Sequence, residues 1–176
     1  MTQRWIGMTH MPKEDIKMSN EYKDWLRDRA EEAKEWVEKY PFLRIKLNDC
    51  YPWEDDEEEI ESCWIFDLPV GWQNGFGAQM CDELMTVLGK YTDDFLILQL
   101  KEKYNEMRLY WGWVDRECTD KENEDMRGLY DAIEDIISKY AEISYNTCVV
   151  CGKPATQYTQ GGWYQGYCAD CYERFR

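Results

Sequence analysis

The chain has 176 residues and a net charge of −15, and 15% of its residues are aromatic. That aromatic share is ample for a packed core, so the composition excludes a disordered chain despite the charge. No apolar run reaches the roughly 18–20 residues of a membrane helix, and the first residues lack the basic-then-apolar pattern of a signal peptide. We therefore expect a cytoplasmic protein without membrane contact.

The first part of the chain predicts one helix and two short strands after an N-terminal arm. The arm, residues 1–19, has no firm apolar period. The next apolar residues follow three-and-four spacing up to Tyr40, which predicts an amphipathic helix that Pro41 ends. Alternation over residues 42–47 predicts a strand, and residues 63–66 predict a second strand that is short and buried.

The middle of the chain predicts a helix followed by a β-hairpin. The helix has an apolar face and ends at Gly89, because glycine favours the backbone conformation that closes a helix. Residues 95–100 form a strand too apolar for an outer edge, and residues 108–114 return as its partner. Residues 104–107 make the turn between them.

A long helix completes the main domain. It follows a polar loop at residues 115–123, and its apolar residues from Met126 to Ile143 lie on one stripe. A small antiparallel sheet packed with about three helices gives an α+β fold. We assign residues 20–145 to this acidic domain.

Acidic residues concentrate between Leu47 and Gly89, where the chain has no lysine or arginine. Phosphate contacts need cations, so this stretch disfavours direct binding of nucleic acid. It suits a partner protein with a basic surface, although such a run can equally be a solvated loop. The residues of this stretch that we predict to contact a partner are Glu54, Asp55, Asp56, Glu57, Glu58, Glu59 and Glu61.

Residues 146–176 predict a C-terminal zinc ribbon. Cys148 and Cys151 form one Cys-x-x-Cys pair, and Cys168 and Cys171 form a second pair after sixteen intervening residues. Two such pairs can place four thiolates around one Zn²⁺ ion. Four thiolates leave no open coordination position, so we expect one structural zinc ion as the cofactor.

The ribbon is expected to be a hairpin, with residues 155–158 and 163–167 on either side of a glycine turn. It has more aromatic residues than so small a core needs, and we predict that Trp163 and Tyr164 face a partner. The remaining cysteines are irregularly spaced, and in a reducing compartment we expect free, partly buried thiols. They are Cys50, Cys63, Cys81 and Cys118.

Several segments carry a resemblance to a known family. They are Pro69-x-Gly71-Trp72, the run from Gln99 to Tyr110, Ala141-Glu142-x-Ser144, Thr147-Cys148-x-x-Cys151-Gly152-x-Pro154, Gly161-Gly162-Trp163 and Cys168-x-x-Cys171. Over roughly residues 66–172 they resemble a family of small zinc-ribbon proteins found in bacteriophage and prophage genomes. The family has two glycines in its hairpin turn, where this chain has Asn105 and Glu106. The family has no established activity, and the resemblance implies a protein that binds a host component in the cytoplasm of the host cell.

Two other classes of function stay open. Asp93 or Asp94, together with Gln99 and Lys101, loosely matches a metal-dependent nuclease, although Gln99 and Lys101 would share a strand face with Ile97. Alternatively, tryptophans could line a pocket that sequesters a small nucleotide signal. The candidates for that pocket are Trp64, Trp72, Trp111 and Trp113.

The sequence favours a non-enzymatic protein that acts by protein–protein contact. Nucleophilic catalysis lacks support, because His10 is the only histidine that could serve as its base. We expect an accessory protein that inhibits or redirects a host factor, such as a defence protein or one that handles nucleic acid. The oligomeric state stays open at this point.

Overall fold

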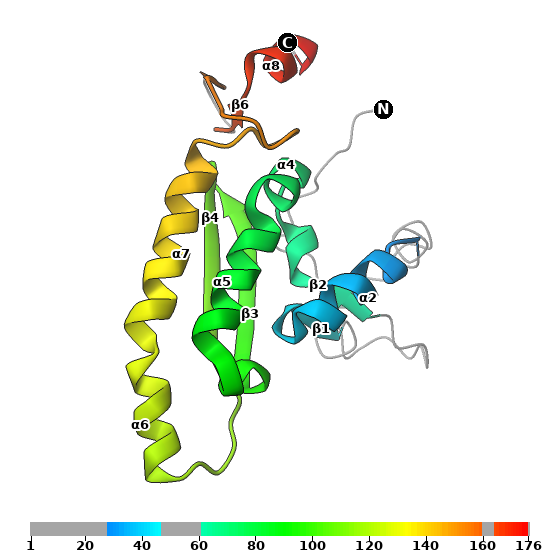
Figure 1. Ribbon diagram of the computed structural model, residues 1–176. Helices are drawn as coiled ribbons and strands as arrows, with labels where there is room; N and C mark the ends of the chain where they lie inside the picture. Colours follow the sequence, from blue (N-terminus) through cyan, green and yellow to red (C-terminus); the bar gives the residue numbers. More distant parts are fainter. Residues whose placement is uncertain (1–27, 47–60, 160–163, 176) are drawn as a thin grey trace, which may run out of the picture.

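A two-stranded antiparallel hairpin and two helices form the centre of the fold in the computed structural model, which describes residues 28–46, 61–159 and 164–175 (Figure 1). The hairpin consists of β3 (Phe95–Lys103) and β4 (Glu106–Trp113). Helices α5 (Ala78–Leu88) and α7 (Tyr130–Tyr145) cover the same face of it (Figure 1). This packing buries one face of the hairpin and leaves the other without a described layer.

The core between the hairpin and the helices consists of large side chains that are almost fully buried. Burial of such apolar surface is the main stabilising contribution to folding. The largest members of this core are Trp72, Tyr40, Tyr140, Leu43, Ile65, Met80, Leu84, Leu88, Leu100, Met107 and Ile133. The α+β class expected from the sequence is therefore present among the described residues, with three separate two-stranded sheets in place of one small sheet.

The N-terminal elements differ from the prediction in their strands. Helix α2 (Ala30–Lys39) ends before Pro41 as predicted, but Pro41–Leu43 forms a 3₁₀ turn, because proline at its first position fixes a helical φ. The strand predicted over residues 42–47 is only β1 (Arg44–Lys46) in the described part. It pairs in an antiparallel manner with β2 (Glu61–Cys63).

The prediction of a strand over residues 63–66 is wrong beyond Cys63, where β2 ends. Trp64–Asp67 turns as a 3₁₀ segment, which lets Ile65 and Phe66 both reach the core although they are adjacent in sequence. A continuous helical run follows, from α4 (Val70–Trp72) through a π turn (Gln73–Gly77) into α5. It ends at Gly89 as predicted, and this glycine has a positive φ of 52°.

The hairpin has a bulge at Leu98 that the sequence pattern did not predict. Register shifts between Ile97 and Gln99, so Ile97 and Leu100 both face the core. Gln99 and Lys101 consequently lie on the face opposite Ile97, and the prediction that these three share a face is wrong. The strand is also longer than predicted and reaches Lys103.

The hairpin turn consists of Tyr104 and Asn105, which both have positive φ angles, of 57° and 62°. Two consecutive positive φ angles define a type I′ turn, whose twist matches that of the flanking strands. Glu106 already belongs to β4, where it pairs with Lys103. Of Asn105 and Glu106, which are both predicted to lie in the turn, only Asn105 is a turn residue.

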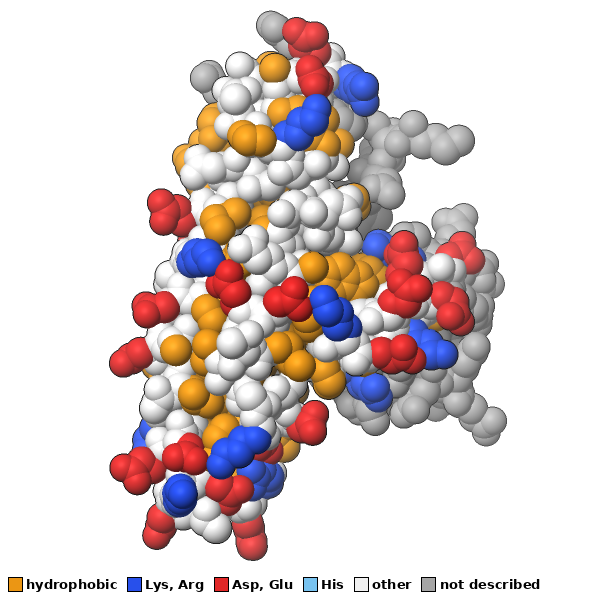
Figure 2. All heavy atoms as spheres, in the orientation of Figure 1, with side chains coloured by type: hydrophobic (Ala, Val, Ile, Leu, Met, Phe, Trp, Pro, Cys, Tyr) orange, Lys and Arg blue, Asp and Glu red, His pale blue; other side chains and the backbone are white. Residues whose placement is uncertain are grey.

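The single long helix predicted at the end of the main domain is two consecutive helices in the structure. α6 (Asp120–Gly128) begins with a capping box of Thr119 and Glu122, and α7 follows after Leu129. None of the described helices combines the length and the apolar character that crossing a membrane requires. Figure 2 shows acidic and basic side chains interspersed over the lower part of the face drawn.

The C-terminal segment contains the short hairpin expected for the ribbon. Strand β5 (Gln157–Tyr158) pairs with β6 (Gly166–Tyr167), and the glycine turn between them lies outside the described residues. Helix α8 (Ala169–Phe175), which the sequence did not predict, follows directly and carries the last cysteine. The segment lies across the end of α7 (Figure 1).

Candidate metal centre

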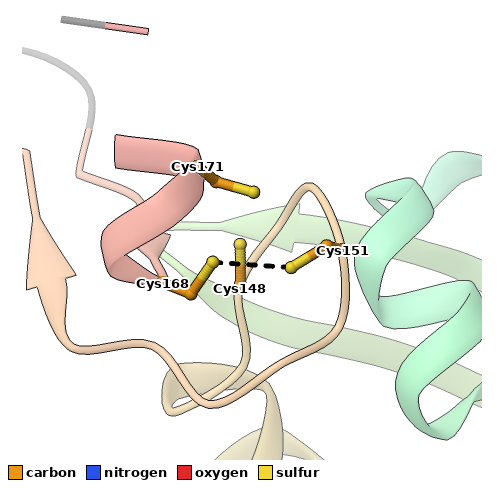
Figure 3. Close-up of side chains that lie close together, drawn as sticks. All are labelled: Cys148, Cys151, Cys168 and Cys171. Atoms are coloured by element: carbon orange, nitrogen blue, oxygen red, sulfur yellow. Dashed lines mark hydrogen bonds between the residues drawn. The ribbon is translucent and has the colours of Figure 1, made fainter. Parts of the chain in front are cut away.

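Four cysteines meet at the C-terminal end of the molecule (Figure 3). Cys148 and Cys151 come from the turn after α7, Cys168 directly precedes α8, and Cys171 lies in the first turn of α8. Their Sγ atoms all lie within 4.8 Å of one another. Within residues 28–46, 61–159 and 164–175, no other group of at least three cysteine, histidine or acidic side chains has metal-binding geometry.

The spacing of the sulfurs fits one tetrahedral metal ion. Metal–sulfur bonds of about 2.3 Å place neighbouring thiolates about 3.8 Å apart. The Sγ atoms of Cys151 and Cys168 are 3.6 Å apart. Cys148, Cys168 and Cys171 are buried while Cys151 is exposed, so the site is open to solvent on one side only. The sequence prediction that these four residues form one cluster is confirmed.

Local backbone geometry explains how the first pair forms. The amide of Gly152 donates to the carbonyl of Cys148 at 3.0 Å, and the amide of Cys148 donates to the carbonyl of Lys153 at 2.8 Å. Gly152 has a φ of 78°, which a residue with a side chain rarely adopts. This tight turn is what brings two thiols three positions apart onto the same side.

The backbone around the cluster favours a thiolate at Cys148. Burial raises the pKa of its thiol, but hydrogen bonds from the amides of Cys168, Cys151 and Val150 outweigh burial and lower the pKa to about 7. At Cys171, burial and the neighbouring thiols raise the pKa to about 12. A metal ion binding at neutral pH therefore displaces at least the proton of Cys171.

The cysteine turn is packed directly against α4. The amide of Gly71 donates to the carbonyl of Val149 at 3.0 Å, and Nε1 of the buried Trp72 donates to the carbonyl of Thr147 at 3.0 Å. A Cβ added at Gly71 would lie 2.1 Å from the carbonyl oxygen of Cys148, and one at Gly152 would lie 2.6 Å from that of Gly71. The two glycines thus permit a backbone approach that no larger residue could allow.

Asn105 connects the ribbon to the tip of the main hairpin. Its side chain is fully buried; Nδ2 donates to the carbonyl of Tyr145 at 2.8 Å, and Oδ1 accepts from the amide of Gly166 at 2.7 Å. Sequence reasoning placed Asn105 in the turn but missed this role. The available signal was an asparagine in a two-residue turn, because asparagine tolerates a positive φ and its amide can both donate and accept.

These contacts cross residue 146, the predicted boundary between the acidic domain and the ribbon. Gly71, Trp72 and Asn105 belong to one side, and their partners Val149, Thr147 and Gly166 belong to the other. The cysteine cluster is therefore packed as part of the main domain.

Three tyrosines stack where the end of α7 meets the ribbon, and we call them the tyrosine stack: Tyr145, Tyr158 and Tyr164. The rings of Tyr158 and Tyr164 are nearly parallel, with an interplanar angle of 6° and centroids 5.6 Å apart. Tyr145 stacks on both of them, and its hydroxyl lies 2.9 Å from that of Tyr164. Tyr145 is 43% exposed, so the stack has a solvent-facing edge.

The other predicted partner-binding residues have mixed outcomes. Tyr164 lies in the tyrosine stack, while Trp163 and the acidic residues 54–59 lie outside the described residues. Glu61 is a residue of β2, where its backbone is paired with that of Lys46. The structure therefore brings one of the predicted partner-binding residues into a defined surface.

The residues proposed for a nuclease have other partners. The carboxylate of Asp94 binds the guanidinium of Arg116 through two hydrogen bonds of 2.6 and 2.8 Å. Nζ of Lys101 donates to Oε1 of Gln99. Asp94 is thus held in an ion pair, and the described residues hold no second group of three or more cysteine, histidine or acidic side chains close enough to share a metal ion.

The tryptophans proposed for a nucleotide pocket serve mainly in packing. Trp72 is fully buried, and Trp111 and Trp113 are half-buried and pack edge to face with centroids 5.5 Å apart. Nε1 of Trp111 donates to the carboxylate of Glu134 at 2.7 Å. These contacts are typical of tryptophans at the edge of a hydrophobic core, where the ring is largely buried and the indole N–H has a hydrogen-bond partner.

The remaining described cysteines are free thiols, as predicted. Cys63 and Cys81 are buried and Cys118 is partly buried, while Cys50 lies outside the described residues. Burial raises the pKa of Cys63 to about 12, so this thiol is protonated and unreactive at neutral pH.

Comparison of the chain with protein-family models, with curated proteins and with solved structures finds no match.

Proposed function

We propose that a zinc ion at Cys148, Cys151, Cys168 and Cys171 holds the ribbon in its folded form. Tetrahedral sites of four thiolates take zinc or iron, and zinc is the usual ion of structural sites on paired Cys-x-x-Cys turns. The protein would supply all four ligands, so the ion would have no position left for water or substrate. Its proposed role is structural.

We propose further that the protein acts by protein–protein contact through the tyrosine stack. Tyrosines are enriched at protein interfaces because they bury a large rigid area and keep a polar tip. The observation that carries the proposal is the ordered stack of Tyr145, Tyr158 and Tyr164 at the ribbon surface. The metal cluster and Asn105 fix the backbone that presents these rings.

The proposed partner is a host protein with a basic surface, which the contact would inhibit or redirect. Support comes from the net charge of −15 and from the resemblance to phage proteins. Charge complementarity would steer the encounter, and the tyrosines would supply the buried contact. The acidic residues 54–59 would contribute to the steering.

Affinity capture from a bacterial lysate tests this proposal. A zinc-loaded chain with Tyr158→Ala and Tyr164→Ala should lose the captured partner, because the stacked pair no longer exists. Tyr130→Ala is the matched control, since Tyr130 is 54% exposed but lies at the start of α7, outside the ribbon. Both variants should keep one zinc ion and the wild-type circular dichroism.

The acidic stretch supplies a second arm of the same experiment. Replacing the six acidic residues 54–59 by serine and glutamine should slow the association and reduce its salt dependence. A partner that still binds the folded double tyrosine variant with unchanged affinity would contradict the proposed surface.

A further inference from the structure

The outer face of the β3–β4 hairpin, which points away from α5 and α7, has an unusual composition. Four apolar side chains on it are 41–56% exposed. They are Leu96, Leu98, Tyr110 and Val114. A two-stranded sheet is marginal alone, and an exposed contiguous apolar face commonly marks an interaction site.

The apolar residues form one continuous strip along the face. Leu96 lies opposite Gly112. The bulged Leu98 lies beside the same glycine, and a Cβ added at Gly112 would be 3.8 Å from Leu98 Cδ1. Tyr110 lies opposite Gln99. The amide of Val114 donates to the carbonyl of Asp94, which extends the ladder by one more pair. Gly112 therefore adds no side chain of its own, and Leu98 lies beside it on the strip.

Cations lie at the turn end of this face. Lys101 is paired with Arg108 across the strands, and Lys103 with Glu106. The carboxylate of Glu106 forms an ion pair with Arg108 at 2.8 Å. In the part of the chain that the structure describes, neither Lys101 nor Lys103 takes part in an ion pair.

Acids lie at the opposite, open end of the same hairpin. Asp93 precedes β3 and Asp115 follows β4, and both are exposed. Neither has an ion-pair partner among residues 28–46, 61–159 and 164–175. Asp94 beside them is neutralised by Arg116. Within the described residues, the hairpin thus runs from acids without an ion-pair partner, through an apolar strip, to cations without one.

We infer that this face binds a second copy of the chain. A two-fold axis through the middle of the strip, near Leu98 and Tyr110, sets the two hairpins antiparallel. Lys101 and Lys103 of one copy then lie over the Asp93 and Asp115 end of the other, and the same contact occurs twice. A surface with opposite charges at its two ends and an apolar centre is self-complementary in this arrangement, as a two-fold interface requires.

The size of the face predicts a weak dimer. Eight strand residues extend over about 27 Å, and a two-stranded face of that length is smaller than the roughly 800 Å² that each partner buries in a stable interface. The dissociation constant should therefore be on the order of tens of micromolar. The dimer would also present two ribbons at once, which strengthens binding to a partner that has two matching sites.

Sedimentation equilibrium of the zinc-loaded full chain tests the inference, from about 1 to about 300 μM so as to bracket the expected dissociation constant. The wild-type mass should rise from one chain to two. Leu98→Glu should weaken the dimer at least about tenfold, since it buries an unpaired charge at the centre of the strip. Val70→Glu, at an equally exposed valine on α4, should leave it unchanged.

A charge-swap experiment tests the orientation. The variant Lys101→Glu with Lys103→Glu, and the variant Asp93→Lys with Asp115→Lys, should each be monomeric because like charges then face each other. An equimolar mixture of the two should form mixed dimers. The control Lys34→Glu with Lys121→Glu makes the same change in net charge at two exposed lysines elsewhere and should dimerise like the wild type.

Three outcomes would overturn the inference. The wild type could stay monomeric at every concentration; this would overturn the inference even if a different protein were found to bind the face. The Leu98→Glu variant could dimerise as the wild type does. The mixture of the two charge-swapped variants could stay monomeric, which would rule out the antiparallel arrangement.

Discussion

At the scale of single residues, Asn105 is the position where the hairpin turn and the ribbon meet. It adopts a positive φ, which asparagine tolerates better than most residues. Its buried amide satisfies one backbone donor and one backbone acceptor of the ribbon. The same residue therefore closes the turn and binds the ribbon.

We predict that Asn105→Gly lowers the free energy of unfolding by about 2–4 kcal/mol, because the amide of Gly166 and the carbonyl of Tyr145 lose their partner inside the protein. Tyr104→Gly is the matched control. It also has a positive φ but is 69% exposed, and glycine adopts this φ without strain, so its substitution should leave stability unchanged or raise it. Urea unfolding measures both, and equal effects would contradict the bridging role of Asn105.

Gly71 supplies the second residue-scale prediction. Gly71→Ala should destabilise the fold by about 1–3 kcal/mol and weaken metal binding, because the new methyl group displaces the turn that carries Cys148. Gly128→Ala, at the end of α6 where nothing lies within 4 Å, should be neutral or stabilising. Thermal unfolding and a chelator competition assay measure the two effects. A Gly71→Ala chain with wild-type metal affinity would show that the close approach to α4 is unimportant.

The residues of the metal cluster could be predicted from the sequence, whereas those that dock it could not. Cys148, Cys151, Cys168 and Cys171 follow a local spacing rule, because a tight turn alone brings two thiols together. Gly71 and Asn105 act on segments far away in the sequence, and no local pattern encodes such contacts. Their importance becomes visible only when the chain is folded.

At the scale of elements, helix ends agreed with local signals while strands did not. Pro41 and Gly89 end their helices as predicted, since both residues act through their own backbone. The bulge at Leu98 is different, because it depends on how β3 packs against β4 and the core. Because of this bulge, Gln99 and Lys101 lie on the outer face, whereas simple alternation along the strand would place them on the same face as Ile97.

The start of α6 supplies the element-scale prediction. The hydroxyl of Thr119 accepts from the amide of Glu122, and the Glu122 carboxylate accepts from the amide of Thr119. Thr119→Ala should therefore cost about 1 kcal/mol of stability, without changing metal affinity, since α6 lies far from the cysteines. Ser138→Ala, at an exposed position within α7, is the control and should be nearly neutral. An effect of Thr119→Ala no larger than that of the control would argue against the capping box.

At the scale of the whole molecule, the segments that carry the four cysteines are packed into one unit with the main domain. The turn after α7 contacts α4, the ribbon hairpin contacts the tip of β3–β4, and α8 supplies the last thiol. Composition and cysteine spacing were enough to predict a ribbon after an α+β domain. They could not predict that the ribbon is packed into that domain, because this depends on contacts between distant segments.

Metal affinity should depend on pH in a direction that the thiol pKa values set. Cys171, with a pKa of about 12, is protonated at neutral pH without metal and must lose its proton to bind. Each ion therefore releases at least one proton, and apparent affinity should fall at least about tenfold for each pH unit of acidification. Competition with a chelator at about pH 6.5, 7.5 and 8.5 measures the slope. A flat profile would contradict binding by four thiolates.

Native mass spectrometry of the purified chain tests the central claim most directly, namely that four cysteines hold one zinc ion on which the ribbon depends. The wild type should carry one zinc ion per chain, and Cys168→Ser should carry none or bind it far more weakly. The control Cys81→Ser, at a buried thiol away from the cluster, should keep the ion. The claim would be contradicted by a folded wild-type chain that carries no metal or holds iron. It would also be contradicted by a mass that is lower by the hydrogens lost when these cysteines form disulfides.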